Sequence, residues 1–281
     1  MIIDVHTHVY PEEFVQDQEL ISKTEPYFDL LTHNKVHKWG TAEDLIRCMD
    51  ETGVDQSWIF GFAFKDPGLC AACNDYVIAA VKRFPDRLKG FASISPRSKG
   101  FTAEIERCAD AGLIGVGELF PQGQMFSLDD IRQTWRLAEV LSERELILNV
   151  HTAEPVGHSY AGKGTVGPKE AAGFCINHPD VKVIFAHFGG GLWLYECMPE
   201  MKLYLKNAYY DTAAWPFLYD SQVMSAAKSA GVLCKMLYGT DWPILDRKRF
   251  ESRIQDCKLT QEECAAFMGG TAKNMLFGKE V

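Results

Sequence analysis

Three polar side chains alternate with apolar ones in the first ten residues, "MIIDVHTHVY". This alternation predicts a short buried strand. Because successive side chains of a strand point to opposite faces, we expect Asp4, His6 and His8 to leave from one face. Histidine and aspartate bind divalent metals and transfer protons, so this face predicts a metal centre or a catalytic site. The alternative is a histidine-rich segment without a functional role, and the residues in the rest of the chain distinguish the two.

Residues of the same types follow other apolar segments. His151 ends "LILNVH", His187 ends "VKVIFAH" and Asp241 ends "KMLYGTD". Imidazoles and a carboxylate that converge would suit a borderline divalent cation such as zinc, with one position open for water or substrate. Structural histidines in the core are the alternative, but these residues avoid the middles of strands and the faces of helices, where such histidines would be expected.

The elements that must position these residues alternate along the chain. With the opening strand, eight strands are predicted, the other seven at 57–62, 89–94, 114–119, 146–151, 181–187, 208–214 and 235–241. Segments with helical periodicity lie between them, and this alternation favours a parallel (β/α)8 barrel. An open doubly wound sheet is the competing architecture, but no G-x-G-x-x-G follows the first strand. Barrel enzymes place their chemistry at the carboxyl ends of the strands, where the polar residues fall.

Start and stop signals delimit several helices. One helix is predicted to start after Thr41 and stop at Gly53, and another to begin at Ser127, with Asp130 three residues on. Residues 9–40 form a long excursion after the first strand, which we expect to cover the site as a lid. We find no linker or repeat, so residues 1–281 are predicted to form a single domain.

Composition limits the partners that this chain can have. It contains 281 residues, 47% of them hydrophobic and 24% charged, which is ordinary for a globular protein. The net charge of −9 argues against a nucleic acid partner. No apolar run is long enough to span a membrane, and we expect a cytoplasmic protein. The nine scattered cysteines suit reduced thiols, and the lone C-x-x-C of Cys70 and Cys73 lacks a second pair for a zinc site.

The ordered motifs "DVHTH", "NVHTAEP", "IFAHFGGG", "YGTDWP" and "GGTAKNMLFG" resemble those of the amidohydrolase superfamily. Within it, the chain is similar to the branch that groups metal-dependent hydrolases with decarboxylases of the aminocarboxymuconate-semialdehyde type. The resemblance implies a distorted (β/α)8 barrel with one divalent metal, held by His6, His8, His151 and Asp241. It also implies that His187 lies beside the metal as an acid or base.

One position departs from the binuclear members of that superfamily. They carry a carbamylated lysine at the end of the fourth strand, where this chain has Glu118 in "GVGELF". A mononuclear site is the simpler inference, with zinc as the expected metal and manganese or iron as alternatives. Glu118 is either a further ligand or a buried hydrogen-bond acceptor.

Two further segments contain polar residues that suggest contacts. The loop after the fifth strand carries Glu154, His158, Tyr160 and Lys163, which are expected to face a polar or anionic small molecule. A glycine-rich loop whose polar groups bond its own backbone is an equal alternative. The histidines at 33 and 37 lie four residues apart in the excursion, and we expect them to form a solvated surface pair.

A bound divalent cation acidifies its water, and Asp241 and His187 would complete a hydrolytic set. We therefore expect a metal-dependent hydrolase of a small amide, lactone or ester. A non-oxidative decarboxylase of an unsaturated or aromatic carboxylic acid is the alternative enzyme, because the same ligands serve both reactions. A non-catalytic metal-binding barrel is the alternative from another class. The expected partner is a small molecule, and a homodimer is compatible with the sequence.

Overall fold

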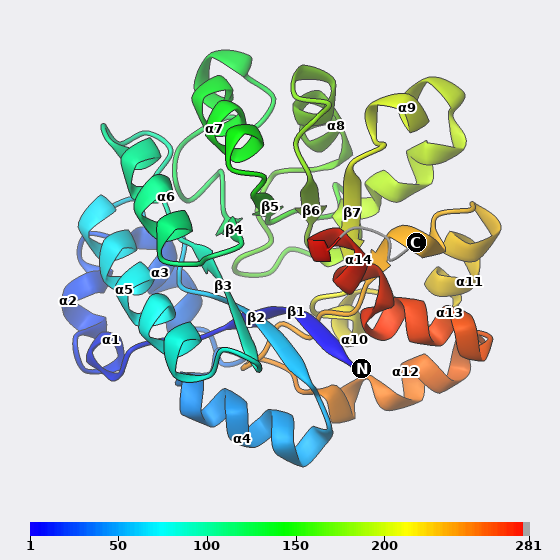
Figure 1. Ribbon diagram of the computed structural model, residues 1–281, viewed down its shortest axis with the longest axis horizontal. Coiled ribbons are helices and arrows are strands. Elements are labelled where there is room, and N and C mark those ends of the chain that lie inside the picture. Colours follow the sequence, from blue (N-terminus) through cyan, green and yellow to red (C-terminus); the bar gives the residue numbers. More distant parts are fainter. Residues whose placement is uncertain (278–281) are drawn as a thin grey trace.

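The computed structural model describes residues 1–277, in which eight parallel strands form one sheet in the order of the sequence (Figure 1). The strands are β1 (Ile3–His8), β2 (Gln56–Phe60), β3 (Leu88–Ala92), β4 (Gly115–Leu119), β5 (Ile147–Val150), β6 (Val183–Phe185), β7 (Ala208–Asp211) and β8 (Met236–Leu237). Each lies at a predicted strand, so the predicted (β/α)8 barrel is confirmed. Several strands end earlier than predicted, and His151, His187 and Asp241 lie just beyond them.

The barrel closes between its last and first strands. The Val5 amide donates to the Tyr238 carbonyl at 2.9 Å, and the Asp241 amide donates to the His6 carbonyl at 2.9 Å. The His8 amide continues this pairing with a hydrogen bond of 2.7 Å to the Trp242 carbonyl. The segment after β8 is therefore fastened to β1, which brings Asp241 beside the two histidines of the first strand.

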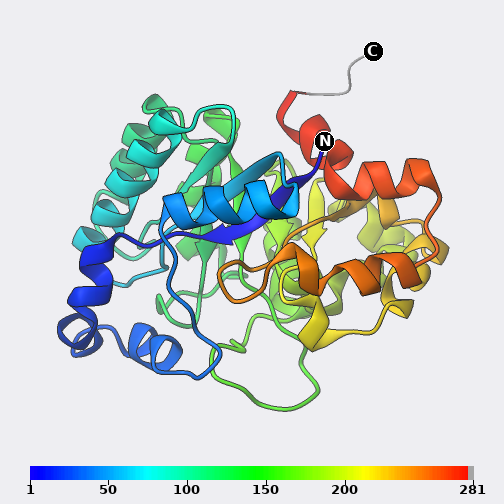
Figure 2. The same ribbon diagram turned by 90° about the horizontal axis from the view of Figure 1, so that it is seen from below.

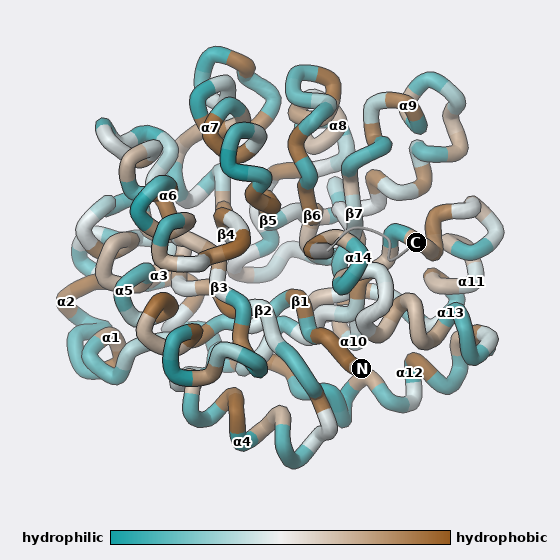
Figure 3. Tube along the Cα trace, in the orientation of Figure 1, coloured by the Kyte–Doolittle hydropathy of each residue, from teal (hydrophilic) through white to brown (hydrophobic). Residues whose placement is uncertain are grey.

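Helices surround the strands, as Figure 1 shows. They are α4 (Ala42–Thr52), α5 (Pro67–Arg83), α6 (Phe101–Asp110), α7 (Ile131–Glu143), α8 (Pro168–Asn177), α9 (Pro199–Tyr204), α10 (Trp215–Leu218), α11 (Gln222–Ser229), α12 (Glu251–Asp256), α13 (Gln261–Ala265) and α14 (Thr271–Phe277). Along the chain, hydrophobic stretches coincide with inner strands such as β6, and hydrophilic stretches lie mainly on the outer helices (Figure 3). None of the helices in residues 1–277 combines the length and apolar character needed to cross a membrane.

The predicted start is confirmed for one helix and wrong for another. Thr41 caps α4 in a capping box with Asp44, and Gly53 ends it in the left-handed conformation at φ 70°. The predicted start at Ser127 is wrong, because Asp130 is itself the N-cap of α7 and its side chain accepts from the Arg132 amide. The segment before Asp130 forms turns instead.

The barrel interior is apolar at the end opposite the strand-end residues. Its buried cluster comprises side chains from the strands, with two from α14: Ile3, Val5, Trp58, Phe60, Phe91, Ile147, Ile184, Leu237, Ala272 and Met275. In Figure 2, α14 lies at one end of the molecule, and the loop after β5 lies at the other. The C-terminal helix thus packs against one mouth of the barrel and leaves the other to the functional residues.

The excursion after β1 is helical. It contains α1 (Glu12–Gln16), α2 (Gln18–Ser22) and α3 (Pro26–Thr32). The three short helices lie at the same end of the molecule as the loop after β5 (Figure 2). Buried aromatic side chains hold the segment to the barrel, because Phe14 and Phe28 pack on Phe64, with ring centroids 5.5 and 5.3 Å apart.

The expectation that Asp4, His6 and His8 share one face is wrong for Asp4. The ladder between β1 and β2 shifts register between Asp4 and Thr7, so the simple alternation is interrupted there. Asp4 lines a small cavity against α4 and accepts hydrogen bonds from the amide and hydroxyl groups of Thr240, at 3.0 and 2.6 Å. It therefore positions the backbone next to Asp241 from outside the barrel, whereas the two histidines face the mouth.

The cysteines are free thiols throughout residues 1–277. Cys70 and Cys73 are buried in α5, and the Cys70 thiol donates to the Phe64 carbonyl at 3.4 Å. Burial raises the pKa of the Cys73 thiol to about 12. Both side chains belong to the buried apolar cluster that also contains Phe14, Phe28 and Phe64.

Candidate metal centre

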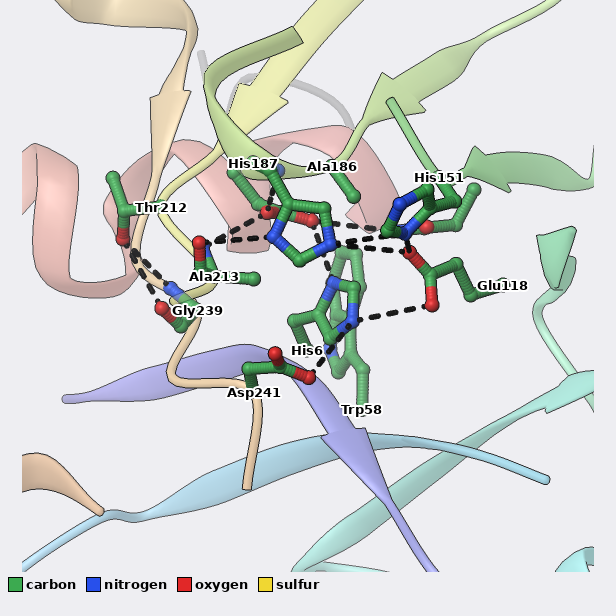
Figure 4. Close-up of polar contacts among 12 residues, drawn as sticks. His6, Trp58, Glu118, His151, Ala186, His187, Thr212, Ala213, Gly239 and Asp241 are labelled. Atoms are coloured by element: carbon green, nitrogen blue, oxygen red, sulfur yellow. Dashed lines mark hydrogen bonds and ion pairs between the residues drawn. The ribbon is translucent and has the colours of Figure 1, made fainter. Parts of the chain in front are cut away.

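Titratable side chains from five strand ends meet at the open mouth of the barrel, and Figure 4 labels all of them except His8. They are His6 and His8 of β1, Glu118 of β4, His151 after β5, His187 after β6 and Asp241 after β8. The possible ligand atoms form two groups, and within each group all the atoms lie within 4.8 Å of one another. One group comes from His6, Glu118 and His187, and the other from His6, His8 and Asp241. The residues that the sequence places at strand ends are thus brought together, although they are up to 235 positions apart.

The first subset surrounds the histidines of β1. The Nε2 atoms of His6 and His8 are 3.2 Å apart. Oε2 of Glu118 lies 3.7 Å from Nε2 of His6 and 3.5 Å from Nε2 of His8, and Oδ1 of Asp241 lies 3.7 Å from both. Donor atoms that share one cation with bonds near 2 Å are separated by about these distances, so the subset has the dimensions of a metal site.

The second subset lies on the other oxygen of Glu118. Oε1 of that carboxylate is 3.1 Å from Nδ1 of His151 and 3.5 Å from Nε2 of His187. The same two nitrogen atoms are 3.1 Å from each other. Glu118 therefore joins the two subsets through its two oxygen atoms.

Backbone carbonyl groups determine which nitrogen atoms of these rings carry protons. Nδ1 of His8 contacts the Gly61 carbonyl at 3.2 Å, and Nδ1 of His187 contacts the Ala213 carbonyl at 3.1 Å. A carbonyl only accepts, so in the neutral rings Nδ1 carries the hydrogen and Nε2 presents a lone pair. In His151 the two ring nitrogen atoms have the opposite roles. Its Nε2 contacts the Lys163 carbonyl at 3.2 Å, and its Nδ1 faces the cluster.

Asp211, at the end of β7, holds the remaining ring. Its Oδ2 contacts Nδ1 of His6 at 2.9 Å, and its Oδ1 accepts from the amides of His187 and Ala213, both at 3.0 Å. A carboxylate behind an imidazole fixes the tautomer and makes the opposite nitrogen a better ligand. Asp211 was not predicted from the sequence, although its place at a strand end in "AYYDTAA" was the available signal.

The pKa values of the cluster reflect its buried carboxylates. Burial disfavours the charged form of His6, but Asp211 and Glu118 outweigh it and hold the pKa of His6 well above its usual value. Burial likewise opposes protonation of His187, and the hydrogen bond to Glu118 still raises its pKa to about 9. Burial opposes ionisation of Glu118, yet His6 and His151 lower its pKa well below the usual value. The site therefore favours positive charge at its centre.

The donor set fits a divalent cation. In their neutral forms, the rings of His6 and His8 direct lone pairs at each other across 3.2 Å, and those of His151 and His187 do so across 3.1 Å. Such pairs repel unless protons or a cation lie between them. Imidazole nitrogen and carboxylate oxygen atoms are the donors of zinc, manganese and iron sites. Among the ligands predicted from the sequence, Glu118 contacts both subsets. His151 lies in the second subset, with His187, and not beside His8 and Asp241.

A cavity of about 370 Å³ opens onto this cluster. His8, His151, His187 and Asp241 form its polar floor. The rest of the lining is the wall, which comes from segments outside the strands: Tyr10, Leu31, Asn34, Val36, His37, Phe62, His158, Tyr160, Ala161, Gly162, Ala214, Phe217, Leu218 and Ile244. Its volume suits a small molecule.

The loop residues predicted to bind substrate divide into two pairs. His158 and Tyr160 line the cavity. Glu154 and Lys163 are not among its lining residues: Nζ of Lys163 donates to the carbonyls of Val156 and His158 at 2.6 and 3.1 Å. Lys163 therefore bonds the loop to itself, which was the alternative for this segment. Glu154 instead contacts Tyr219, and burial together with this contact raises the pKa of that phenol.

The expected surface pair of histidines is also divided. His33 is exposed and bonds Glu19 and Asp29 at 3.3 and 3.1 Å. His37 lines the cavity, its ring contacts Tyr10 and Trp39, and its Nε2 is buried without a hydrogen-bond partner. Burial lowers the pKa of His37 to about 4, so this ring is uncharged at neutral pH. The expectation of a solvated pair is wrong for His37.

A family model described as Amidohydrolase matches residues 3–278 of the chain. The fold is similar to that of 5-carboxyvanillate decarboxylase from Sphingomonas paucimobilis, with a TM-score of 0.77, 15% identity and 98% of each chain covered. It is also similar to a dihydroxybenzoic acid decarboxylase from Polaromonas sp. JS666 with bound manganese and 2-nitroresorcinol (TM-score 0.72, 18% identity, 98% of this chain and 96% of that one). A 4-oxalomesaconate hydratase from Rhodopseudomonas palustris is similar as well (TM-score 0.69, 18% identity, 98% and 95%). No curated protein matches the chain.

Proposed function

The chain belongs to the amidohydrolase family, and from this premise we propose that it is a metal-dependent decarboxylase of a small cyclic carboxylic acid. The observation that carries the proposal is the apolar cavity over the polar cluster, because Phe62, Phe217 and Leu218 offer hydrocarbon surface in the same cavity that His187 and Asp241 line. An apolar wall favours a ring and excludes water, whereas a polar floor binds the carboxylate. The fold shared with several decarboxylases supports the same reaction.

His6, His8, Glu118 and Asp241 would hold a divalent cation in this proposal. His151 and His187, on the other oxygen of Glu118, would complete its surroundings. When bound, the cation would orient the acid group of the substrate and neutralise its charge. We propose manganese as the first metal to test, because two of the four donors are carboxylates and a structure of similar fold contains manganese. Zinc, the metal expected from the sequence, is the second.

The chemistry assigned to the chain is the supply of one proton. Decarboxylation without an oxidant adds a proton to the carbon that carries the carboxylate, breaks the bond between them and releases carbon dioxide. We assign the transfer of this proton to Asp241, which lines the cavity beside the histidines of β1 and whose carboxylate would take the proton from a water molecule and pass it to that carbon. His187 is assigned to the oxygen atoms of the substrate, because the Ala213 carbonyl fixes its ring at the cavity floor. Water restores the proton after each turnover.

Hydrolysis is the second candidate. Asp241 and His187 both line the cavity, so a bound water would have a base and an oxyanion-stabilising group within reach. A probable 2-pyrone-4,6-dicarboxylic acid hydrolase with a similar fold supports this alternative. The apolar wall offers few groups for the polar atoms of an amide, which is why decarboxylation is placed first.

The two reactions are separated by their products. The purified chain, loaded with manganese and separately with zinc, is incubated with hydroxybenzoic acids and with aromatic lactones and amides. Release of carbon dioxide with loss of the carboxylate from the ring supports the proposal. Consumption of lactones or amides without carbon dioxide release would show that hydrolysis is the activity. Inactivity of both metal-loaded forms on all acids would contradict the proposal.

A further inference from the structure

The wall of the cavity lacks a positive charge. Leu31, Phe62, Phe217, Leu218 and Ile244 are apolar side chains of the wall, and no lysine or arginine lies among the lining residues found in the described chain. A carboxylate on the distal part of a ligand would therefore lose its water without gaining a counter-charge. Burying an ionised group in this way is strongly unfavourable.

Two of the neighbouring lysines are engaged in bonds to the backbone, and a third, Lys35, is exposed and does not line the cavity. Nζ of Lys163 donates to two carbonyl groups of its own loop. Nζ of Lys38 donates to the carbonyl of Ile244 at 2.9 Å, so it fastens the excursion to the segment after β8. Neither ammonium group belongs to the cavity lining. To reach a ligand, each would have to give up the contacts that close the wall.

The floor offers no surplus positive charge either. Glu118 and Asp241 carry two negative charges, which balance the two positive charges of a divalent cation. Asp211 adds a further carboxylate against the His6 ring at 2.9 Å, and Oε1 of Glu118 lies 3.5 Å from Nε2 of His187. One carboxylate can still bind as a direct ligand of the cation, but a second carboxylate would not meet a net positive charge that attracts it.

We propose that the substrate carries a single acidic group, which binds at the metal centre, and that the rest of the molecule is an uncharged ring. The proposal rests on the decarboxylase function for the place of the acidic group. His37 and Asn34 are the polar groups that the excursion adds to the wall, and His37 is uncharged. Its buried Nε2 lacks a partner, so a hydroxyl or methoxy substituent would suit this part of the wall better than an anion.

Two acids of matched shape test this inference by binding. 3-Methylbenzoate and isophthalate differ only in a methyl group against a second carboxylate. Their affinities for the manganese-loaded protein are measured by calorimetry at pH 7.5, where both carboxylates are ionised. We expect isophthalate to bind at least about tenfold more weakly, because its second charge is buried without a partner. Equal or tighter binding of isophthalate, or failure of both acids to bind, would overturn the inference.

A charge placed on the wall should reverse the preference. Phe217 is 51% exposed and lines the cavity, so Phe217→Arg adds a guanidinium at a position that tolerates it. The ratio of the two affinities should move towards isophthalate by about tenfold. Leu203→Arg is the matched control, since Leu203 is 73% exposed on α9 and does not line the cavity. An unchanged ratio in Phe217→Arg would contradict the role given to the charge of the wall.

The inference about charge and the proposed function can fail independently of each other. If 3-methylbenzoate is preferred but no acid releases carbon dioxide, the decarboxylase proposal fails and the inference about charge stands. If carbon dioxide is released from benzenedicarboxylates as readily as from monocarboxylates, the inference fails and the decarboxylase proposal stands.

Discussion

The floor of the cavity is built from strand ends, whereas its wall is built from connecting segments. The floor is a set of buried and half-buried titratable groups whose imidazole rings each contact a backbone carbonyl, as His187 contacts Ala213 and His8 contacts Gly61. The wall is largely apolar and partly exposed, and Phe217 and Val36 are about half exposed, at 51% and 52%. Changes to the floor should therefore remove the metal and the reaction, whereas changes to the wall should alter which molecule binds.

Asp241→Asn is expected to have the largest effect. Asparagine keeps the shape of the side chain but removes a charge that faces His6 and His8 at 3.7 Å, together with the proposed proton. Turnover should fall by about 10³-fold, the range of lost general acid catalysis, with weaker metal binding. Steady-state rates and metal content are measured together. Asp180→Asn, at an 81% exposed surface ion pair, is the control, and unchanged turnover in Asp241→Asn would refute the assignment.

Asp211→Asn should weaken the floor from behind. An amide nitrogen beside Nδ1 of His6 cannot accept its hydrogen, so the ring loses its preferred tautomer. Metal affinity is expected to fall by about 10- to 100-fold, as for other outer-shell carboxylates. A positioning role predicts that excess metal restores much of kcat, which chelator competition and metal titration would measure.

The control for Asp211→Asn is Asp130→Asn at the N-cap of α7, which keeps an oxygen to accept from the Arg132 amide but removes the ion pair with the Arg132 guanidinium at 2.9 Å. This variant should lose stability without losing metal affinity. If both variants bind metal equally well, Asp211 has no role in orienting His6.

The floor could be predicted from the sequence because its residues obey a geometric rule. In a parallel barrel, every strand ends at the same mouth, so His6, His151, His187 and Asp241 had to converge once the strands were recognised. Asp211 obeys the same rule. It was missed because an aspartate in "AYYDTAA" has no spacing to a second ligand that would single it out.

Other features depend on contacts that spacing does not encode. The register shift in β1 turns the Asp4 side chain to the outside of the barrel, and nothing in "IDVHTH" indicates such a shift. His33 and His37 differ in burial because the segment after α3 turns back over the mouth, so that only His37 meets Tyr10 and Trp39. The position of the Lys163 side chain likewise depends on contacts within its loop, because its Nζ donates to the carbonyl groups of Val156 and His158.

The stability of the metal-free protein should depend on pH in a direction set by the floor. The pKa of His187 is raised to about 9, and that of His6 is raised as well, so protonation stabilises the folded state. This stabilisation is complete below the unfolded pKa of about 6.5 and is lost as the pH rises through the folded value near 9. We expect Tm of the metal-free chain to fall by several degrees between pH 6.5 and pH 9.5.

The metal-loaded form supplies the comparison for this titration. A bound cation takes the place of the protons, so its Tm should change less over the same pH range. Scanning calorimetry of both forms in matched buffers would measure the difference. A metal-free Tm that rises with pH would contradict the raised pKa values of the floor.

His37→Leu should have the smallest effect, because it changes only the wall. Leucine fills the space of the ring but removes Nε2, which is buried without a partner in the absence of a ligand. Metal affinity and kcat should stay the same, and KM for a hydroxybenzoate should rise by a few fold, about the value of one hydrogen bond to a neutral group. His33→Leu is the matched control on the same segment, because His33 is exposed and bonds only surface carboxylates. An equal change of KM in both variants would mean that the excursion acts through its stability, and a fall of kcat in His37→Leu would move this residue from the wall to the floor.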